Sequence, residues 1–262
     1  MDLTADETAP LLAQALASGM DLVLSNKRPL AGPRAESERL HELARAYGRR
    51  MRHETTVGAG LPVIDTYYKL IESGDRVEKI EGALSGTLGF LLDEVSQGRP
   101  FSAALRDAME RGYTEPDPRD DLSGMDVGRK ALILGRLLGF PGELRPSMVE
   151  SLVPRPARGL PLPAFIKGLE RLDPHWKRRV DAALARGRVL RYVATVTRRS
   201  LAVALCEVDR SSPFAALKGA DNTVVFTTAR YKSNPLVITG PGAGPAVTAA
   251  GVLNDVLQLA GA

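Results

Sequence analysis

The stretch from residue 112 to 130, GYTEPDPRDDLSGMDVGRK, holds the side chains of this sequence best suited to proton-transfer chemistry. Asp126 and Lys130 stand four residues apart, so a helix would place this carboxylate and this amine on one face. Glu115 and Asp121 precede them, and we expect all four side chains to converge where a loop meets a helix. An amine held among carboxylates can donate a proton to a carbonyl oxygen or take one from a hydroxyl.

The elements around these residues follow from local signals. Pro116 and Pro118 predict an extended loop without a helix, because each fixes its own φ and biases the preceding residue away from the α region. Ser123 and Asp126 have the spacing of a capping box, which predicts a helix start. The apolar stripe of that helix is Ile133, Leu134, Leu137 and Leu138. The alternative interpretation, a solvated Asp–Lys pair beside an ordinary surface loop, is the commoner use of such residues.

Composition is that of an ordinary globular protein, with 44% hydrophobic and 25% charged residues among 262. The net charge of +4 is scattered along the chain, which argues against a nucleic-acid surface and suits a small anionic ligand. The single cysteine, Cys206, excludes an intrachain disulfide and makes a thiolate metal site implausible, so a reducing cytoplasm is expected. His41, His53 and His175 lack metal-ligand spacing, and we expect them in surface or loop positions.

Neither a membrane span nor a signal peptide is expected. No apolar run is long enough to cross a bilayer, and the first ten residues are acidic rather than basic.

The first sixty residues alternate helical and strand patterns joined by short connections, which predicts a parallel βαβ arrangement. Ligands meet such sheets at the carboxyl ends of strands, where Asn26 and Lys27 are expected. The predicted elements are a helix over 4–19 with Thr4 as N-cap, a strand over 21–25, a helix over 34–48 and a strand over 51–57. No G-x-G-x-x-G turn precedes them, so we expect a chain that starts partway through a nucleotide-binding domain.

The remainder predicts a mixed or antiparallel sheet with helices, and hence an α/β chain with an α+β catalytic domain. A tight bend over 57–64 uses Gly58 and Gly60 and leads into a helix with Pro62 at its first position. Further on we expect a strand over 76–85, a helix capped by Ser85, a helix over 103–111 capped by Ser102, a proline-rich spacer over 140–164, helices over 164–171 and 174–186, strands over 188–197, 200–209, 222–231 and 235–240, and a C-terminal helix over 245–260 with Val247, Ala250, Leu253, Val256 and Leu257 inward.

The central stretch resembles the signature of homoserine dehydrogenases, a Tyr-Thr-Glu-Pro-Asp-Pro-x-x-Asp-Leu-x-Gly-x-Asp-Val-x-x-Lys run, and every position of that pattern is present. This resemblance implies that Lys130 handles the substrate proton, with Lys27 as a second cation and Asp121 holding Lys130. Its implied substrate-binding residues are Glu115, Asp126, Tyr113, Gly86 and Thr87.

Two further segments resemble the same family. The bend at 57–64 is similar to a loop that binds a monovalent cation, usually sodium, which implies the Glu54 carboxylate and the main-chain oxygens of Val57, Ala59 and Leu61 as ligands. The GPGAG turn before the last helix resembles the segment that returns to the nucleotide domain. The implied cofactor contacts are Thr4, Lys27, Gly112 and Gly244.

The resemblance implies interconversion of L-homoserine and L-aspartate 4-semialdehyde with NADP or NAD, in threonine and methionine biosynthesis. It implies a partial dinucleotide-binding domain over 1–60, a catalytic and dimerisation domain over 61–240, and a returning helix over 241–262. A homodimer is expected, together with an upstream aspartokinase or nucleotide-domain segment that completes a truncated chain. Two alternatives are an inactive homologue that serves only as a dimerising domain and a sugar- or amino-acid-binding module without chemistry.

Overall fold

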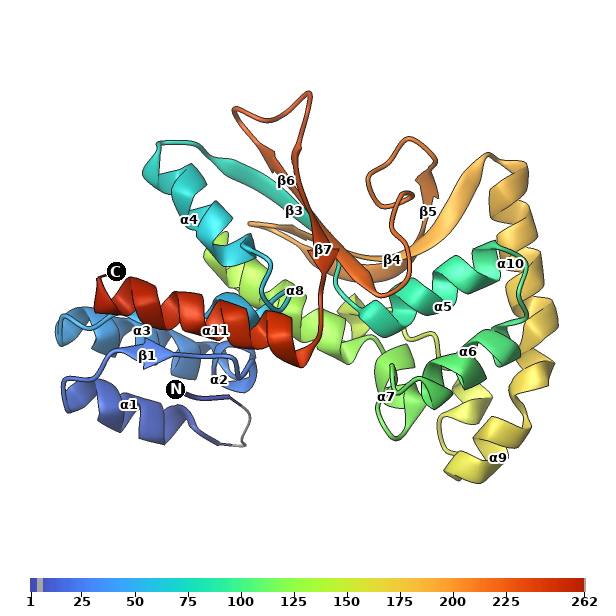
Figure 1. The fold of residues 1–262 in the computed structure, drawn as a ribbon, viewed down its shortest axis with the longest axis horizontal. Helices are drawn as coiled ribbons and strands as arrows, with labels where there is room; N and C mark the ends of the chain where they lie inside the picture. Colours follow the sequence, from blue (N-terminus) through green and yellow to red (C-terminus); the bar gives the residue numbers. More distant parts are fainter. Residues whose placement is uncertain (4–6, 262) are drawn as a thin grey trace.

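Two sheets organise the chain, which is seen here as a computed structural model that describes residues 1–3 and 7–261. The result is a mixed α/β fold, as expected (Figure 1). The strands are β1 Leu22–Val23, β2 Met51–Arg52, β3 Val77–Ala83, β4 Arg188–Thr197, β5 Leu201–Asp209, β6 Asp221–Thr228 and β7 Leu236–Pro241. The helices are α1 Ala9–Ala17, α2 Arg28–Ala31, α3 Arg34–Ala46, α4 Val63–Glu72, α5 Gly86–Ser96, α6 Phe101–Glu110, α7 Pro118–Leu122, α8 Met125–Leu137, α9 Leu162–Lys167, α10 Asp173–Ala185 and α11 Pro245–Ala260.

The small sheet confirms the predicted βαβ arrangement. Strands β1 and β2 pair in parallel, with Leu22 opposite Met51. Asp2 forms a further parallel bridge to Leu24 on the other edge of β1. The first helix begins at Ala9, and the predicted cap Thr4 lies outside the described residues.

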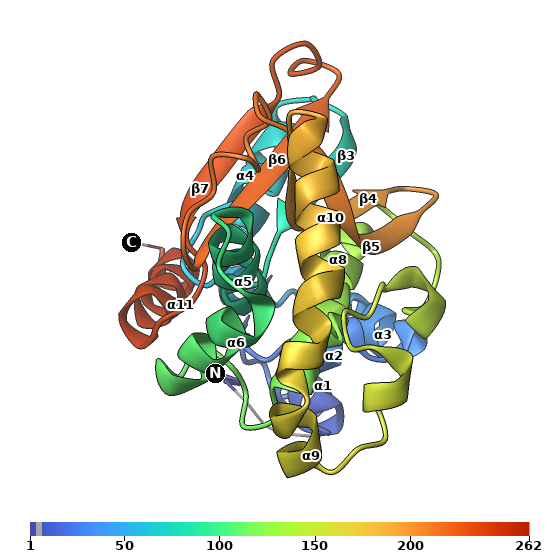
Figure 2. The same cartoon turned by 90° about the vertical axis from the view of Figure 1, so that its right-hand side faces the viewer.

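The large sheet is antiparallel, with strand order β5-β4-β3-β6-β7. Helices α5, α8 and α10 pack against β4, so they cover one face of this sheet (Figure 2). The core beneath them contains fully buried Ile80, Val196 and Phe226. This packing fixes α8, which carries Asp126 and Lys130, relative to the end of β3.

Two local predictions around the central stretch are wrong. A short helix, α7, crosses the loop, because Pro118 occupies its first turn, where no amide donor is needed, and Asp117 caps it by accepting from the Arg119 amide. Helix α8 begins after Gly124, whose φ is 73°, and not with a capping box. The hydroxyl of Ser123 accepts from the Met125 amide, whereas the carboxylate of Asp126 is paired with lysines.

Ser102 is likewise not a cap, since α6 begins at Phe101 after Pro100. The Ser102 hydroxyl instead donates to Asp173 at 2.7 Å, which ties α6 to the start of α10. The predicted cap at Ser85 is confirmed, because its hydroxyl accepts from the Leu88 amide at 3.2 Å.

The C-terminal helix α11 lies across the small sheet, but its predicted inward stripe is wrong (Figure 1). The side chain of Leu253 is 57% exposed, and Ala250, Val256 and Leu257 are exposed as well. The buried residues are Gly251 and Asp255. Gly251 lies on the buried face because α11 packs closely against the loop of Thr55. A Cβ on Gly251 would lie 2.6 Å from the side chain of Thr55. No described helix is long and apolar enough to cross a bilayer.

Candidate active site

One carboxylate joins two lysines that come from different parts of the chain. Oδ2 of Asp126 lies 2.9 Å from Nζ of Lys130, and Oδ1 lies 3.2 Å from Nζ of Lys27. Lys130 also donates to the carbonyl oxygen of Leu84, just after β3, at 2.7 Å. The Asp126–Lys130 pair confirms the predicted one-turn spacing on a helix, and only the packing of α2 beside α8 adds Lys27.

The two lysines keep the carboxylate of Asp126 ionised. Burial raises the pKa of Asp126, but the attraction of Lys130 and Lys27 outweighs burial and lowers the pKa to about 2. Asp126 is therefore ionised at any physiological pH, and both amines have a fixed counter-charge between them.

A cavity of about 520 Å³ opens beside this group. Its lining is rich in charge and includes Glu115, Asp121 and Asp126, three of the four side chains expected to converge, whereas Lys130 is not among the lining residues. The other lining residues are Arg28, Ser85, Asp120, Ser123, Met125, Val127 and Arg129. Carboxylates and guanidinium groups facing one small space suit a zwitterionic amino acid, whose ammonium and carboxylate need opposite partners.

Asp121 orders the loop of Glu115, and its contacts differ from those expected. Its carboxylate accepts from the Glu115 amide at 2.8 Å and from the Thr87 hydroxyl at 3.0 Å. It has no contact with Lys130 among the described residues, where Asp126 and the carbonyl of Leu84 take that place. Burial raises the pKa of Asp121.

Two substrate-site candidates of the sequence lie next to this loop. The Thr87 hydroxyl lies 2.5 Å from the carbonyl oxygen of Tyr113, whose ring packs edge-on against Phe90. Gly86 stands at the first turn of α5, where a Cβ would come within 3.0 Å of the carbonyl oxygen of Ala220. Any side chain at Gly86 would therefore require the backbone at Ala220 to shift by a few tenths of an ångström.

The glycine turns expected to contact a cofactor leave open space. Gly112 and Gly244 have φ of 68° and 128°, and an added Cβ would meet nothing within 4 Å at either. Two residues before Gly244, Gly242 packs against Asn222, whose fully buried side-chain amide has no hydrogen-bond partner among the described residues and was not singled out from the sequence. An unsatisfied buried amide beside an open glycine turn fits a polar ligand group such as a carboxamide.

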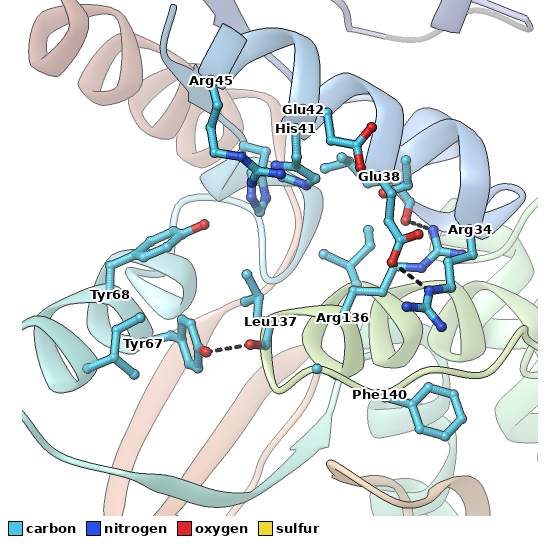
Figure 3. A pocket seen from close by; sticks show the side chains of 16 residues that line it. Arg34, Glu38, His41, Glu42, Arg45, Tyr67, Tyr68, Arg136, Leu137 and Phe140 are labelled. Atoms are coloured by element: carbon cyan, nitrogen blue, oxygen red, sulfur yellow. Dashed lines mark hydrogen bonds and ion pairs between the residues drawn. The ribbon is translucent and has the colours of Figure 1, made fainter. Parts of the chain in front are cut away.

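The three histidines differ in their surroundings. His175 is exposed, as expected. His53 lies in a loop but is buried, and its ring centroid lies 6.5 Å from that of His41 on α3. Both line a second cavity between α3, α4 and the end of α8 (Figure 3). This cavity is distinct from the one at Asp126.

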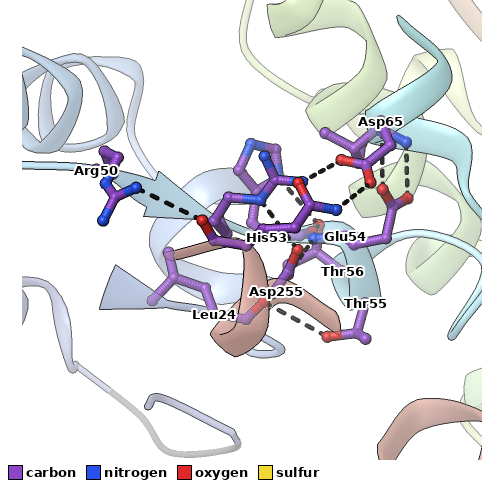
Figure 4. A network of polar contacts seen from close by, with 11 residues as sticks. Leu24, Arg50, His53, Glu54, Thr55, Thr56, Asp65 and Asp255 are labelled. Carbon is purple, nitrogen blue, oxygen red and sulfur yellow. Dashed lines mark hydrogen bonds and ion pairs between the residues drawn. The ribbon is translucent and has the colours of Figure 1, made fainter. Parts of the chain in front are cut away.

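Glu54 and its loop form a compact polar network (Figure 4). The two oxygens of Glu54 accept from the amides of Ile64 and Asp65 at the start of α4, each at 2.7 Å. Burial, opposed by these hydrogen bonds, raises the pKa of Glu54 to about 7. A buried carboxylate in this condition fits a nearby cation, which would restore its charged form.

The main-chain oxygens expected around a cation are partly free. The carbonyl of Leu61 accepts from the Val63 amide, whereas those of Val57 and Ala59 accept from no described group. Ala59 has a φ of 53°, a conformation rare for a residue with a side chain. No cluster of three or more His, Cys, Asp or Glu side chains suited to a metal occurs in the described ranges.

Helix α11 holds this loop from behind. The Asp255 carboxylate accepts from the Glu54 amide at 2.9 Å and from the Arg52 guanidinium at 3.2 Å. Arg52 also contacts Asp65 on α4. The expected return of the C-terminal helix to the N-terminal segment thus takes the form of a buried ion-pair network.

Comparison with known proteins gives one consistent family. The homoserine dehydrogenase family model matches residues 62–257. A bifunctional aspartokinase/homoserine dehydrogenase of maize is 44% identical over 99% of this chain, and the homoserine dehydrogenase of Schizosaccharomyces pombe is 39% identical over 99%. The chain spans 29% of the maize protein and 72% of the yeast protein.

Solved structures agree in fold. A Candida auris protein of unknown function superposes with a TM-score of 0.93 at 39% identity, over 99% of this chain and 75% of its own. A hyperthermophilic archaeal homoserine dehydrogenase in complex with NADPH gives a TM-score of 0.74 at 25% identity, over 98% of this chain and 69% of its own.

Proposed function

Because this chain belongs to the homoserine dehydrogenase family, we propose that it forms the substrate-binding and proton-transferring part of an enzyme that interconverts L-homoserine and L-aspartate 4-semialdehyde. The observation that carries the proposal is the Lys27–Asp126–Lys130 group beside a charged cavity. The retained charge pairs disfavour the alternative of an inactive dimerising homologue.

The proposed chemistry assigns each charged side chain a task. Glu115 and Asp126 bind the substrate ammonium, and Asp121 positions Glu115 through its main-chain amide. In reduction, the ammonium of Lys130 donates a proton to the aldehyde oxygen as the carbonyl carbon gains hydride. In oxidation, the amine of Lys130 takes the hydroxyl proton. The carbonyl of Leu84 and the carboxylate of Asp126 aim Lys130.

The nicotinamide cofactor, NADP or NAD, supplies or accepts the hydride when bound. Lys27, Gly112 and Gly244 are the proposed contacts, supported by the open glycine turns. The complex of the archaeal relative with NADPH favours NADP. Thr4 keeps its proposed role but lies outside the described residues. The domain division at residues 60 and 240 is also part of the proposal.

The test is oxidation of homoserine with NADP, followed at 340 nm, on this chain and on a fusion to the part of the yeast relative that the chain does not span. We expect turnover by the fusion and saturable homoserine binding by both proteins in calorimetry. Binding of neither substrate nor cofactor by the fusion would reject the proposal.

Replacing Glu115 by Gln should weaken substrate binding while leaving the fold unchanged. The amide keeps the shape but lacks the charge that pairs with an ammonium, so we expect KM for homoserine to rise about tenfold with a smaller change in kcat. Steady-state kinetics on the fusion checks this. Glu110→Gln, at the exposed last residue of α6, is the matched control, and an unchanged KM for Glu115→Gln would contradict the assignment.

We further propose that Glu54 and the carbonyls of Val57, Ala59 and Leu61 bind sodium. Adding sodium to protein in tetramethylammonium buffer should then stabilise the fold, by about 2.7 kcal/mol at a hundredfold excess over the dissociation constant. Thermal unfolding measures this gain. Glu54→Gln should abolish it, whereas Glu72→Gln at the exposed end of α4 should preserve it; equal gains in both variants would disprove the site.

The remaining proposals concern the oligomeric state, the cellular location and the biosynthetic pathway. We propose a cytoplasmic homodimer, a link to an aspartokinase segment like that of the bifunctional maize relative, and roles in threonine and methionine biosynthesis. Light scattering on the purified chain tests the dimer, and a monomer at micromolar concentration would argue against it.

A further inference from the structure

The cavity at His41 is a second site, separate from the active centre. It encloses about 410 Å³, a volume within the usual range of small-molecule pockets. Helix α8 connects the two places, because Asp126 stands in its first turn and Arg136 in its last. Ten residues of helix between them amount to about 15 Å.

One wall of this cavity is rich in charged side chains. Along α3, the side chains of Arg34, Glu38, His41, Glu42 and Arg45 face it, and Arg136 faces it from α8 (Figure 3). Two of the three arginines on this wall are paired with glutamates.

The pairing of these charges leaves one arginine available. Arg34 is paired with Glu38 at 2.6 Å. Arg136 is committed to main-chain carbonyls of the α2 segment and to Glu143. Arg45 is exposed, and its side chain makes no ion pair or hydrogen bond with another described residue.

The opposite wall is apolar, and two buried polar atoms between the walls lack hydrogen-bond partners among the described residues. Ile71, Leu137 and Phe140 line the apolar side. Tyr67 donates to the carbonyl of Leu137. Nε2 of buried His53 has no partner among the described groups, and neither does Nε of Arg136. Buried polar atoms in folded proteins are ordinarily satisfied, so these orphans favour a ligand that brings acceptors.

We propose that this cavity binds a small organic anion, with its carboxylate or phosphate head at His41 and Arg45 and its apolar body against Ile71, Leu137 and Phe140. The free guanidinium of Arg45, next to His41, recognises the charge, and the facing apolar wall requires a hydrocarbon or aromatic body. The ligand class is therefore an amphipathic anion, and not an inorganic ion or a cation.

The site should also take up a proton with its ligand. Burial, aided by the positive charges of Arg45 and Arg136, lowers the pKa of His41 in the empty protein. A bound anion opposes this and raises the pKa, so binding is tightest at low pH and weakens as pH rises through the higher, ligand-bound pKa. The groups facing His41 are Glu38, Glu42 and Arg45 on α3, His53 before η1 (Glu54–Thr56), Tyr67 and Tyr68 on α4, and Arg136 on α8.

Calorimetry with three probes of one size tests the recognition: benzoate, benzyl alcohol and benzylammonium. We expect benzoate to bind and the other two to bind at least about tenfold more weakly. Phenyl phosphate decides which head group is preferred. Absence of saturable benzoate binding, or equal binding of benzyl alcohol, overturns the proposal.

Variants locate the site. Arg45→Gln and His41→Gln should each weaken benzoate binding about tenfold, and His41→Gln should remove its pH dependence. Arg39→Gln, on the other face of α3, is the matched control and should bind as the wild type does. Equal benzoate affinity in the wild type and in Arg45→Gln and His41→Gln overturns the assignment, whatever the affinity of the control.

Discussion

Replacing Lys130 by Met lowers kcat of the fusion about 10²- to 10⁴-fold, the range contributed by a general acid or base. The methionine keeps length and packing but cannot carry the proton between the side chain and the substrate oxygen. Because Lys130 contacts Asp126 and the carbonyl of Leu84 and is not part of the core, we expect the fold to remain. Initial rates in both directions, with circular dichroism as a check of folding, measure the effect.

Two control variants test whether the loss of turnover is specific to proton transfer by Lys130. Lys130→Arg keeps the positive charge but cannot lose its proton, so it should bind homoserine normally and still turn over slowly. Lys177→Met removes a lysine from an equivalent i,i+4 pair with Asp181 on α10 and should leave kcat unchanged. Turnover of Lys130→Met within threefold of the wild type would remove Lys130 from the proposed chemistry.

Replacing Asp126 by Asn lowers kcat/KM about 100-fold, because one change removes the counter-charge of two lysines. Without this carboxylate the ammonium groups of Lys27 and Lys130 repel each other, and Lys130 loses a partner that aims it. Initial rates of the fusion over a range of homoserine and cofactor concentrations measure kcat/KM.

A stability measurement separates this electrostatic effect from misfolding. The pKa of Asp126 is lowered from 3.8 to about 2, so its contribution to stability is complete above pH 3.8 and is lost as pH falls through 2. Asp126→Asn lacks this contribution and should show a flatter decline of unfolding free energy in that window. Asp181→Asn is the control on α10, and a kcat/KM of Asp126→Asn within about threefold of the wild type would contradict the proposed role of its ion pairs.

Local signals predicted the active-site elements well where neighbours in sequence decide them. The spacing of Asp126 and Lys130 gave their ion pair, because one helical turn brings residues four apart together. Ser85 gave the start of α5, since a cap needs only its own turn. The prediction of an extended loop was wrong for a similarly local reason. Proline in the first turn of a helix is compatible with the helix, so Pro118 favours α7 rather than preventing it.

The sequence by itself determined which residues are proposed to carry the chemistry, through the signature run, and which helix holds Asp126 and Lys130, since helical periodicity acts over a few residues. Only the tertiary structure decided that Lys27 completes this group, that Asp121 serves Glu115 rather than Lys130, and that α11 buries Asp255 instead of its leucines. These outcomes depend on how distant segments pack. Contacts between distant segments leave no periodic signal in the sequence. Which side chains meet is decided only when the two segments pack together and bury their facing surfaces.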